Sequence, residues 1–143
     1  MNAREGSSAA STARRPPHGT VRLAAELENV AVGRRWLQGR LENDGVGQSA
    51  IADLLQSLSE ALTNAILYGD GLHVGIEYEV NGDSARVSVV NGIRDGAEPQ
   101  RRGPAAPDAE SGRGLDLVEA FSDRWGTATS DTEVKVWFEV KLP

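Results

Sequence analysis

The sequence contains no cysteine, which excludes disulfide bonds and thiolate metal sites. Only two histidines are present, His18 and His73, and their wide separation argues against a structural zinc site. No apolar run approaches the roughly 18 residues of a membrane span, and the first residues lack the apolar core of a secretory signal. We therefore expect no membrane segment, no export signal and a cytoplasmic location.

Positive charge is also in short supply. Fifteen lysines and arginines stand against 21 aspartates and glutamates, giving a net charge of -6 over 143 residues. Because phosphate backbones repel an acidic chain, direct nucleic-acid binding is not expected, and a protein partner with a basic patch is favoured. The hydrophobic fraction of 39% is ordinary for a globular protein, and the length fits one domain.

The distribution of apolar residues predicts a tail followed by a domain. Residues 1–19 are rich in Ala, Ser, Arg and Pro without apolar periodicity, so we predict a disordered tail before a domain over 20–143. Apolar residues alternate in the pattern of β-strands in several later segments. These predicted strands begin at Thr20, cover 74–80, 85–91 and 134–140, and include a short one at Trp125 to Thr127. Asn81-Gly82-Asp83 predicts a hairpin turn.

Three segments have helical periodicity. They are a helix capped by Asn29 that ends at Asn43-Asp44-Gly45, a long helix over 49–68, and a short one over 115–121. In the long helix, Asp53, Ser57, Glu60 and Asn64 fall opposite the apolar stripe. Helices grouped against hairpins predict an α+β fold, a two-layer α/β sandwich.

Glu60 and Asn64 are four residues apart on one face of the long helix. One interpretation is an ordinary solvated face. The other is a site in which Asn64 gives an oxygen ligand to Mg²⁺ and Glu60 accepts a proton from an attacking hydroxyl.

Two further motifs are open to a structural or a functional interpretation. Gly112-Arg113-Gly114-Leu115 opens a helix, where backbone N–H groups bind phosphates well, but it also fits an ordinary loop-to-helix junction. Asn91 ends a strand, where its amide offers an acceptor and a donor to a purine, although Asn-Gly also favours tight turns. The long loop over 92–112 between them is typical of a functional or a disordered segment.

Taken in order, these features resemble the GHKL (Bergerat-fold) ATPases. Ser59 to Ile66 looks like the N box of that group, and the loop before Gly112 looks like its ATP lid. Gly112 to Val118, continuing to Asp123-Arg124-Trp125-Gly126 and Val136-Trp137-Phe138, is similar to the anti-sigma-factor serine kinases of bacterial partner-switching systems. The resemblance covers about Thr20 to Leu142 and implies the histidine-kinase-like ATPase fold.

The resemblance implies an ATP-binding serine/threonine-protein kinase that sequesters a sigma factor and phosphorylates a STAS-type antagonist, with Mg²⁺ as cofactor. A homodimer is compatible with it. Carried over by position, Glu60 is the catalytic base, Asn64 the Mg²⁺ ligand and Asn91 the residue that faces adenine. The implied phosphate contacts are Gly112, Arg113, Gly114, Leu115 and either Thr132 or Lys135.

The sequence departs from the family pattern at three places, one of which is the blurred Gly-Thr or Gly-Lys signal before the last strand. Asn91-Gly92-Ile93-Arg94-Asp95 stands where the family usually has Asp-x-Gly-x-Gly, and Tyr68 replaces a histidine after the N box. These departures leave open a catalytically weak or inactive protein-binding module of the same fold. A histidine-kinase catalytic domain acting in trans is a third alternative.

Overall fold

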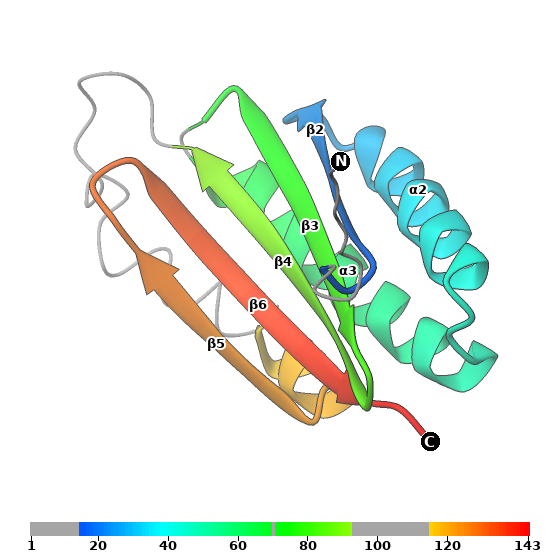
Figure 1. The fold of residues 1–143 in the computed structure, drawn as a ribbon. Helices are drawn as coiled ribbons and strands as arrows, with labels where there is room; N and C mark the ends of the chain where they lie inside the picture. The colour runs from blue at the N-terminus through cyan, green and yellow to red at the C-terminus, as the bar shows by residue number, and fades with distance from the viewer. Residues whose placement is uncertain (1–14, 70, 93–114) are drawn as a thin grey trace, which may run out of the picture.

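The computed structural model describes residues 15–69, 71–92 and 115–143. Its strands form one antiparallel five-stranded sheet in the order β2-β3-β4-β6-β5 (Figure 1). The elements are β2 (His18–Ala24), α2 (Asn29–Asn43), α3 (Gln48–Tyr68), β3 (His73–Asn81), β4 (Ser84–Gly92), a helix over residues 115–121, β5 (Arg124–Thr129) and β6 (Glu133–Lys141).

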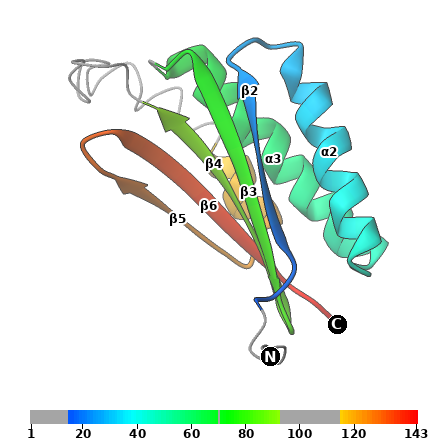
Figure 2. The same cartoon turned by 45° about the horizontal axis from the view of Figure 1, so that its top comes forward.

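The helices lie on one side of the sheet. Figures 1 and 2 show α2, α3 and the 115–121 helix behind the strands, while no helix of the described residues covers the other face. The predicted α+β two-layer sandwich is therefore confirmed. None of the helices in the described ranges is both long and apolar enough to cross a membrane.

Strand alternation and the apolar stripe of α3 build the core between the two layers. Its largest fully buried side chains are Phe138, Leu37, Leu41, Ile51, Leu54, Leu58, Leu62, Ile76, Val74, Val87, Val89 and Val118. Close approach of α2 depends on Gly33, where a Cβ would lie 2.7 Å from Ile76 Cδ1 and 3.0 Å from Leu62 Cδ2. A side chain at this position would push α2 away from the other elements.

The ends of the elements agree with the predictions apart from one helix cap. Gly45 and Gly82 have φ values of +83° and +62°, as expected for a helix terminator and a hairpin turn. Asn29 was predicted to cap α2, but it is the first helical residue, and its amide nitrogen donates to the Ala24 carbonyl at 2.9 Å. It therefore fastens the helix start to the end of β2. The predicted N-terminal tail falls mostly on residues 1–14, which lie outside the described residues. Its last two residues, His18 and Gly19, instead belong to β2 and pair with β3. The division into tail and domain otherwise stays a prediction.

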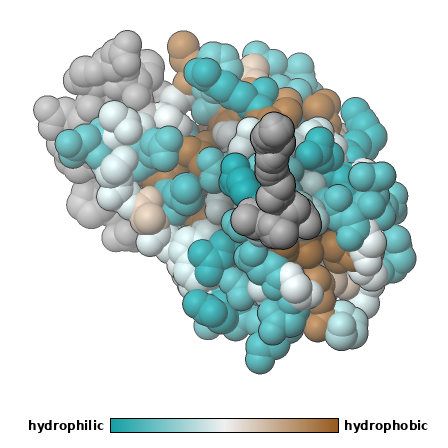
Figure 3. All heavy atoms as spheres, in the orientation of Figure 1, coloured by the Kyte–Doolittle hydropathy of each residue, from teal (hydrophilic) through white to brown (hydrophobic). Residues whose placement is uncertain are grey.

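The uncovered side of the sheet, called here the open sheet face, carries the alternate residues of each strand. In Figure 3 its described part is a mixture of hydrophilic residues and smaller hydrophobic patches. Trp137 lies on this face, with the guanidinium of Arg86 4.1 Å from its ring centroid. Arg86 also bonds Glu139 at 2.8 Å, which ties β4 to β6. This side of the sheet is thus organised by polar and aromatic contacts rather than by a second core.

Candidate functional site

The polar side of α3 is partly enclosed. Glu60 and Asn64 are half-buried, and Ser57, one turn before Glu60, is fully buried. The hydroxyl oxygens of Ser57 and Ser122 are 3.2 Å apart, which joins α3 to the end of the 115–121 helix. The interpretation of this side as a solvated face is therefore wrong for Ser57. A third helix packs against it.

Glu60 occupies a turn of α3 that α2 holds in place. Arg34 on α2 donates to the Leu55 carbonyl at 2.9 Å and to the hydroxyl of Ser59, the residue before Glu60. The Glu60 side chain itself makes no hydrogen bond or ion pair with any residue that the structure describes. A half-buried carboxylate on a fixed helix, with no internal partner, suits a proton acceptor.

Asn91, the last residue but one of β4, lies on the side of the sheet that faces the helices. Its strand partners are Val74 on β3 and Val134 on β6. The Asn91 side-chain oxygen is buried, and no donor within the described residues reaches it. An unpaired buried acceptor of this kind is rare and costs about 1–3 kcal/mol. The position therefore favours a ligand that brings its own N–H group.

Asn91 lies against the C-terminal end of α3. A Cβ placed on Gly69, directly after the helix, would overlap the Asn91 amide nitrogen and the Ala65 carbonyl oxygen. Ala65 follows Asn64 in the chain, so Asn91 lies against the same end of α3 that carries Asn64. The structure thus gathers two of the predicted site residues at one end of this helix.

The two candidate phosphate contacts near the last strand, Thr132 and Lys135, differ in where they lie relative to Asn91. Lys135 lies on the open sheet face in an ion pair with Glu77 at 3.4 Å, so it is on the opposite side of the sheet from Asn91. Thr132 is exposed in the turn between β5 and β6, two residues before Val134, the strand partner of Asn91. Thr132 is the better placed of the two, and its contact with phosphates stays a prediction.

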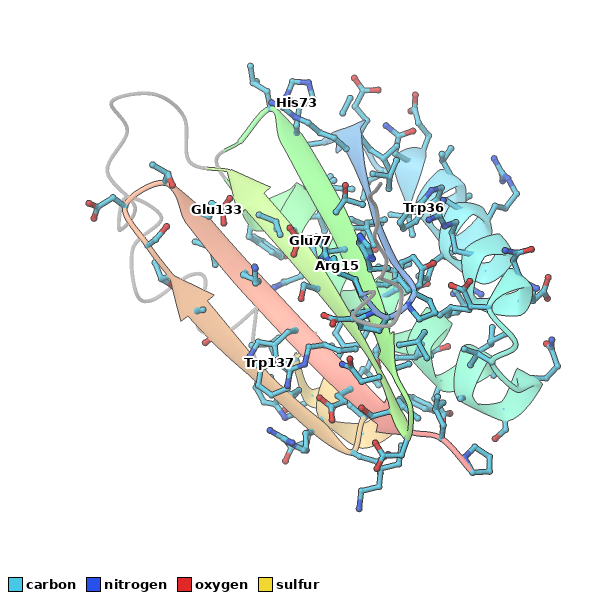
Figure 4. The ribbon with its side chains drawn as sticks, viewed as in Figure 1. Arg15, Trp36, His73, Glu77, Glu133 and Trp137 are labelled. Carbon is cyan, nitrogen blue, oxygen red and sulfur yellow. The ribbon has the colours of Figure 1, made fainter. Side chains whose placement is uncertain are left out.

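Thr132 also borders a hollow of about 860 Å³ at one end of the open sheet face. Gly75, Val90 and Gly92 line it together with Arg22 and Glu77. Figure 4 shows Glu77 and Glu133 toward this end of the sheet and Trp137 nearer the other. Gly71, in the segment that follows α3, also lines this hollow.

Gly112, Arg113 and Gly114 lie outside the described residues, so the structure says nothing of their role. Leu115 is the first described residue of the 115–121 helix and packs against the core.

Arg34 is a residue that sequence reasoning missed. The sequence does hold a signal for it, because Arg34 is a charged residue that lies between Gly33 and Trp36 on the side of α2 that faces the rest of the domain.

Comparison with known proteins agrees with this geometry. Residues 23–139 match the family model described as a histidine kinase-like ATPase domain. The chain belongs to the histidine kinase-like ATPase family. Membership implies a binding site for ATP, in keeping with an unpaired acceptor beside a helix that carries a carboxylate and an amide one turn apart.

Relatives within the family are serine-protein kinases. The serine-protein kinase RsbW of Listeria innocua serovar 6a is 34% identical over 118 residues, which are 73% of this chain and 74% of that protein. The enzyme of the same name from Listeria monocytogenes serotype 4a is 33% identical over 117 residues, with the same coverage. With this identity and coverage, the chain groups with the RsbW serine-protein kinases of the family.

A solved structure shares the fold. The RsbU and RsbW domains of a Mycobacterium tuberculosis protein superpose with a TM-score of 0.66 at 20% identity, covering 88% of this chain. This chain spans only 32% of the length of that one. The likeness supports the two-layer architecture, and nothing about the remainder of the longer protein carries over.

Proposed function

We propose that this domain is an ATP-dependent serine-protein kinase and anti-sigma factor of a partner-switching system. It holds a sigma factor and phosphorylates a serine on a STAS-type antagonist. The observation that carries the proposal is the buried oxygen of Asn91, to which none of the described residues donates, at the end of the helix that also bears Glu60 and Asn64. The RsbW relatives supply the class of reaction.

Adenine fits the environment of Asn91. Its exocyclic amine donates a hydrogen bond, which is what the Asn91 oxygen lacks within the described residues. The amide thereby performs the recognition that the family usually assigns to an aspartate, because both side chains offer an acceptor oxygen. The replacement removes a negative charge from the site and keeps the acceptor.

Asn64 is the proposed protein ligand of Mg²⁺. An amide oxygen is a hard donor, and Mg²⁺ at nucleotide sites takes most of its ligands from phosphates and water. Among the described residues, no three or more His, Asp or Glu side chains are grouped so that they could hold a metal ion by themselves. This agrees with an ion that phosphates and water hold together with Asn64. When bound, Mg²⁺ neutralises charge on the phosphates.

Glu60 is the proposed catalytic base. The serine hydroxyl of the antagonist attacks the γ-phosphorus of ATP, the bond from that phosphorus to the β-phosphate oxygen breaks, and ADP leaves. The proton of the hydroxyl passes to the Glu60 carboxylate. Arg34 holds the turn of α3 that carries Glu60 through its bond to Ser59, so the backbone of this turn is already in place when the hydroxyl attacks.

Transfer of labelled phosphate tests this function. The wild-type chain is incubated with γ-labelled ATP, Mg²⁺ and a STAS-domain protein from the same organism, beside Glu60→Gln and Asp53→Asn. Asp53 is a matched control, because it is also a half-buried carboxylate on α3. We expect acid-stable phosphoserine from the wild type and the control, and a loss of 100-fold or more, roughly, in Glu60→Gln.

The alternatives give different outcomes. Transfer at the control rate in Glu60→Gln would remove the base assignment. Binding of a sigma factor without transfer by the wild type would favour the catalytically inactive module. An acid-labile phosphohistidine product would instead indicate a histidine kinase.

A further inference from the structure

Gly69 stands at a position where the backbone dihedral angles do not call for glycine. It follows the last residue of α3 with φ of -85° and ψ of 169°, which is extended backbone that any residue adopts. Many helices end in a left-handed residue, and glycine is then favoured for its conformation. That reason does not apply to Gly69, so the cause lies in what surrounds it.

The surroundings of Gly69 leave no room for a side chain. A Cβ there would overlap the amide nitrogen and amide carbon of Asn91 and the carbonyl oxygen of Ala65. The Ala65 carbonyl already accepts a hydrogen bond from the Gly69 backbone N–H at 2.9 Å. Asn91 therefore occupies the space that a side chain at position 69 would take.

This packing determines which way the Asn91 amide faces. Its nitrogen is on the side of Gly69 and the Ala65 carbonyl, at the partially negative end of the α3 dipole. Turning the amide over would place its oxygen on the side of the Ala65 carbonyl oxygen, which is unfavourable because both atoms are acceptors. The oxygen is consequently left on the other side, buried and without a donor from the described residues.

We propose that Gly69 is a specificity-determining residue for the nucleotide base, acting through Asn91. Because the amide oxygen is the free group, the site selects adenine, which donates an N–H, over guanine, which presents a carbonyl oxygen at the equivalent position. An asparagine free to turn over accepts either base, so selection depends on the absence of a side chain at position 69. This inference rests on the proposed function, in which the base lies against Asn91.

Titration calorimetry with Mg-ATP and Mg-GTP tests the inference on the full chain. The variants are Gly69→Ala, Asn91→Ala, the double variant and Gly39→Ala. Gly39 is the matched control, since a Cβ there meets nothing within 4 Å. We expect the wild type and the control to prefer ATP by about tenfold or more, the worth of one hydrogen bond. In Gly69→Ala the preference falls to about one.

The double variant separates an effect through Asn91 from general loosening of the helix end. If Gly69 acts through Asn91, the double variant binds ATP as Asn91→Ala does, with no further loss. Losses that add, or a tenfold preference that survives in Gly69→Ala, would overturn the inference. Equal affinity of the wild type for ATP and GTP overturns it while leaving the proposed function standing, whereas no affinity for either removes both.

Asn91→Asp keeps the inference testable if Gly69→Ala does not fold. Both outer atoms of the aspartate are acceptors, so orientation no longer matters and the preference for ATP stays at about tenfold or rises. A preference that falls in this variant would contradict the proposed orientation of the amide.

Discussion

The guanidinium of Arg34 on α2 donates to the hydroxyl of Ser59 on α3, the residue that precedes Glu60. The same group donates to the Leu55 carbonyl one turn earlier. We expect Arg34→Ala to lower the free energy of unfolding by about 1–3 kcal/mol, because a half-buried carbonyl and hydroxyl lose a charged donor. Urea unfolding measures this. The exposed neighbour Arg35→Ala is the control, and an equal effect in both would contradict the structural role of Arg34.

Asn64→Ala is expected to uncouple nucleotide binding from Mg²⁺. In the wild type, Mg²⁺ should strengthen ATP binding, because the ion joins the phosphates to the Asn64 oxygen. In the variant, the ATP affinities measured with Mg²⁺ and with EDTA should differ by about threefold or less. One ligand bond to the ion is expected to change the affinity by about tenfold. Calorimetry in the two buffers decides the matter. A full Mg²⁺ effect in the variant would place the ion on other ligands.

Tyr78 links the sheet to α2, and its phenol makes the free energy of unfolding fall at alkaline pH. It is 4% exposed, donates a hydrogen bond to Asp44, and accepts one from the Arg40 guanidinium at 3.3 Å. Burial, followed by the bond to Asp44, raises the pKa of the Tyr78 phenol above its ordinary 10.0. Folding therefore favours the neutral phenol, and its contribution to stability is present below pH 10 and lost as the pH rises through the higher folded value.

The corresponding experiment is urea unfolding from pH 8 to pH 11. The wild type should hold a constant stability up to about pH 10 and lose it more steeply above that than Tyr78→Phe, which has no proton to release. Asp44→Asn keeps an acceptor for the phenol and should behave like the wild type in direction. Parallel curves for wild type and Tyr78→Phe would show that Tyr78 is not the titrating group.

Gly126 permits Trp137 to lie across β5 on the open sheet face. A Cβ at Gly126 would be 2.8 to 2.9 Å from three atoms of the indole ring. We expect Gly126→Ala to destabilise the domain by about 1 kcal/mol and to change the Trp137 fluorescence, because the ring moves away from Arg86. Gly75→Ala on the same face has its nearest neighbour at 3.6 Å and should be neutral or stabilising. Equal melting temperatures for the two variants would contradict this account.

The elements themselves were predictable, because their signals are local. The apolar stripe of α3 and the alternation of β6 each repeat several times, so the type of element can be read from the sequence alone. Asn81-Gly82-Asp83 forms its hairpin turn because of its own backbone preferences. Asn29 was misassigned because a capping side chain and a first helical residue have the same sequence signal. Its actual hydrogen bond goes to Ala24, which only the packing of β2 against α2 determines.

The site was less predictable because its decisive contacts are distant in sequence. Ser57 fits a polar helix face, yet Ser122, 65 residues later, covers it. Lys135 and Thr132 were equivalent candidates until the register of β6 put Lys135 beside Glu77 on the open sheet face. A glycine directly after a helix, such as Gly69, is common in any sequence, and only the position of Asn91 gives its lack of a side chain another meaning.

The neighbours Trp137 and Phe138 have a consequence for how the chain folds. Phe138 is completely buried and Trp137 lies on the open sheet face, so sliding β6 by one residue would exchange them. Pairing β6 with β4 joins residues that are 41 to 57 positions apart in the chain, so we expect it to follow the closing of either hairpin. Arg86 and Glu139 can bond only in the correct alignment. This ion pair on the open sheet face therefore favours the observed register of β6 on β4 over a shifted one.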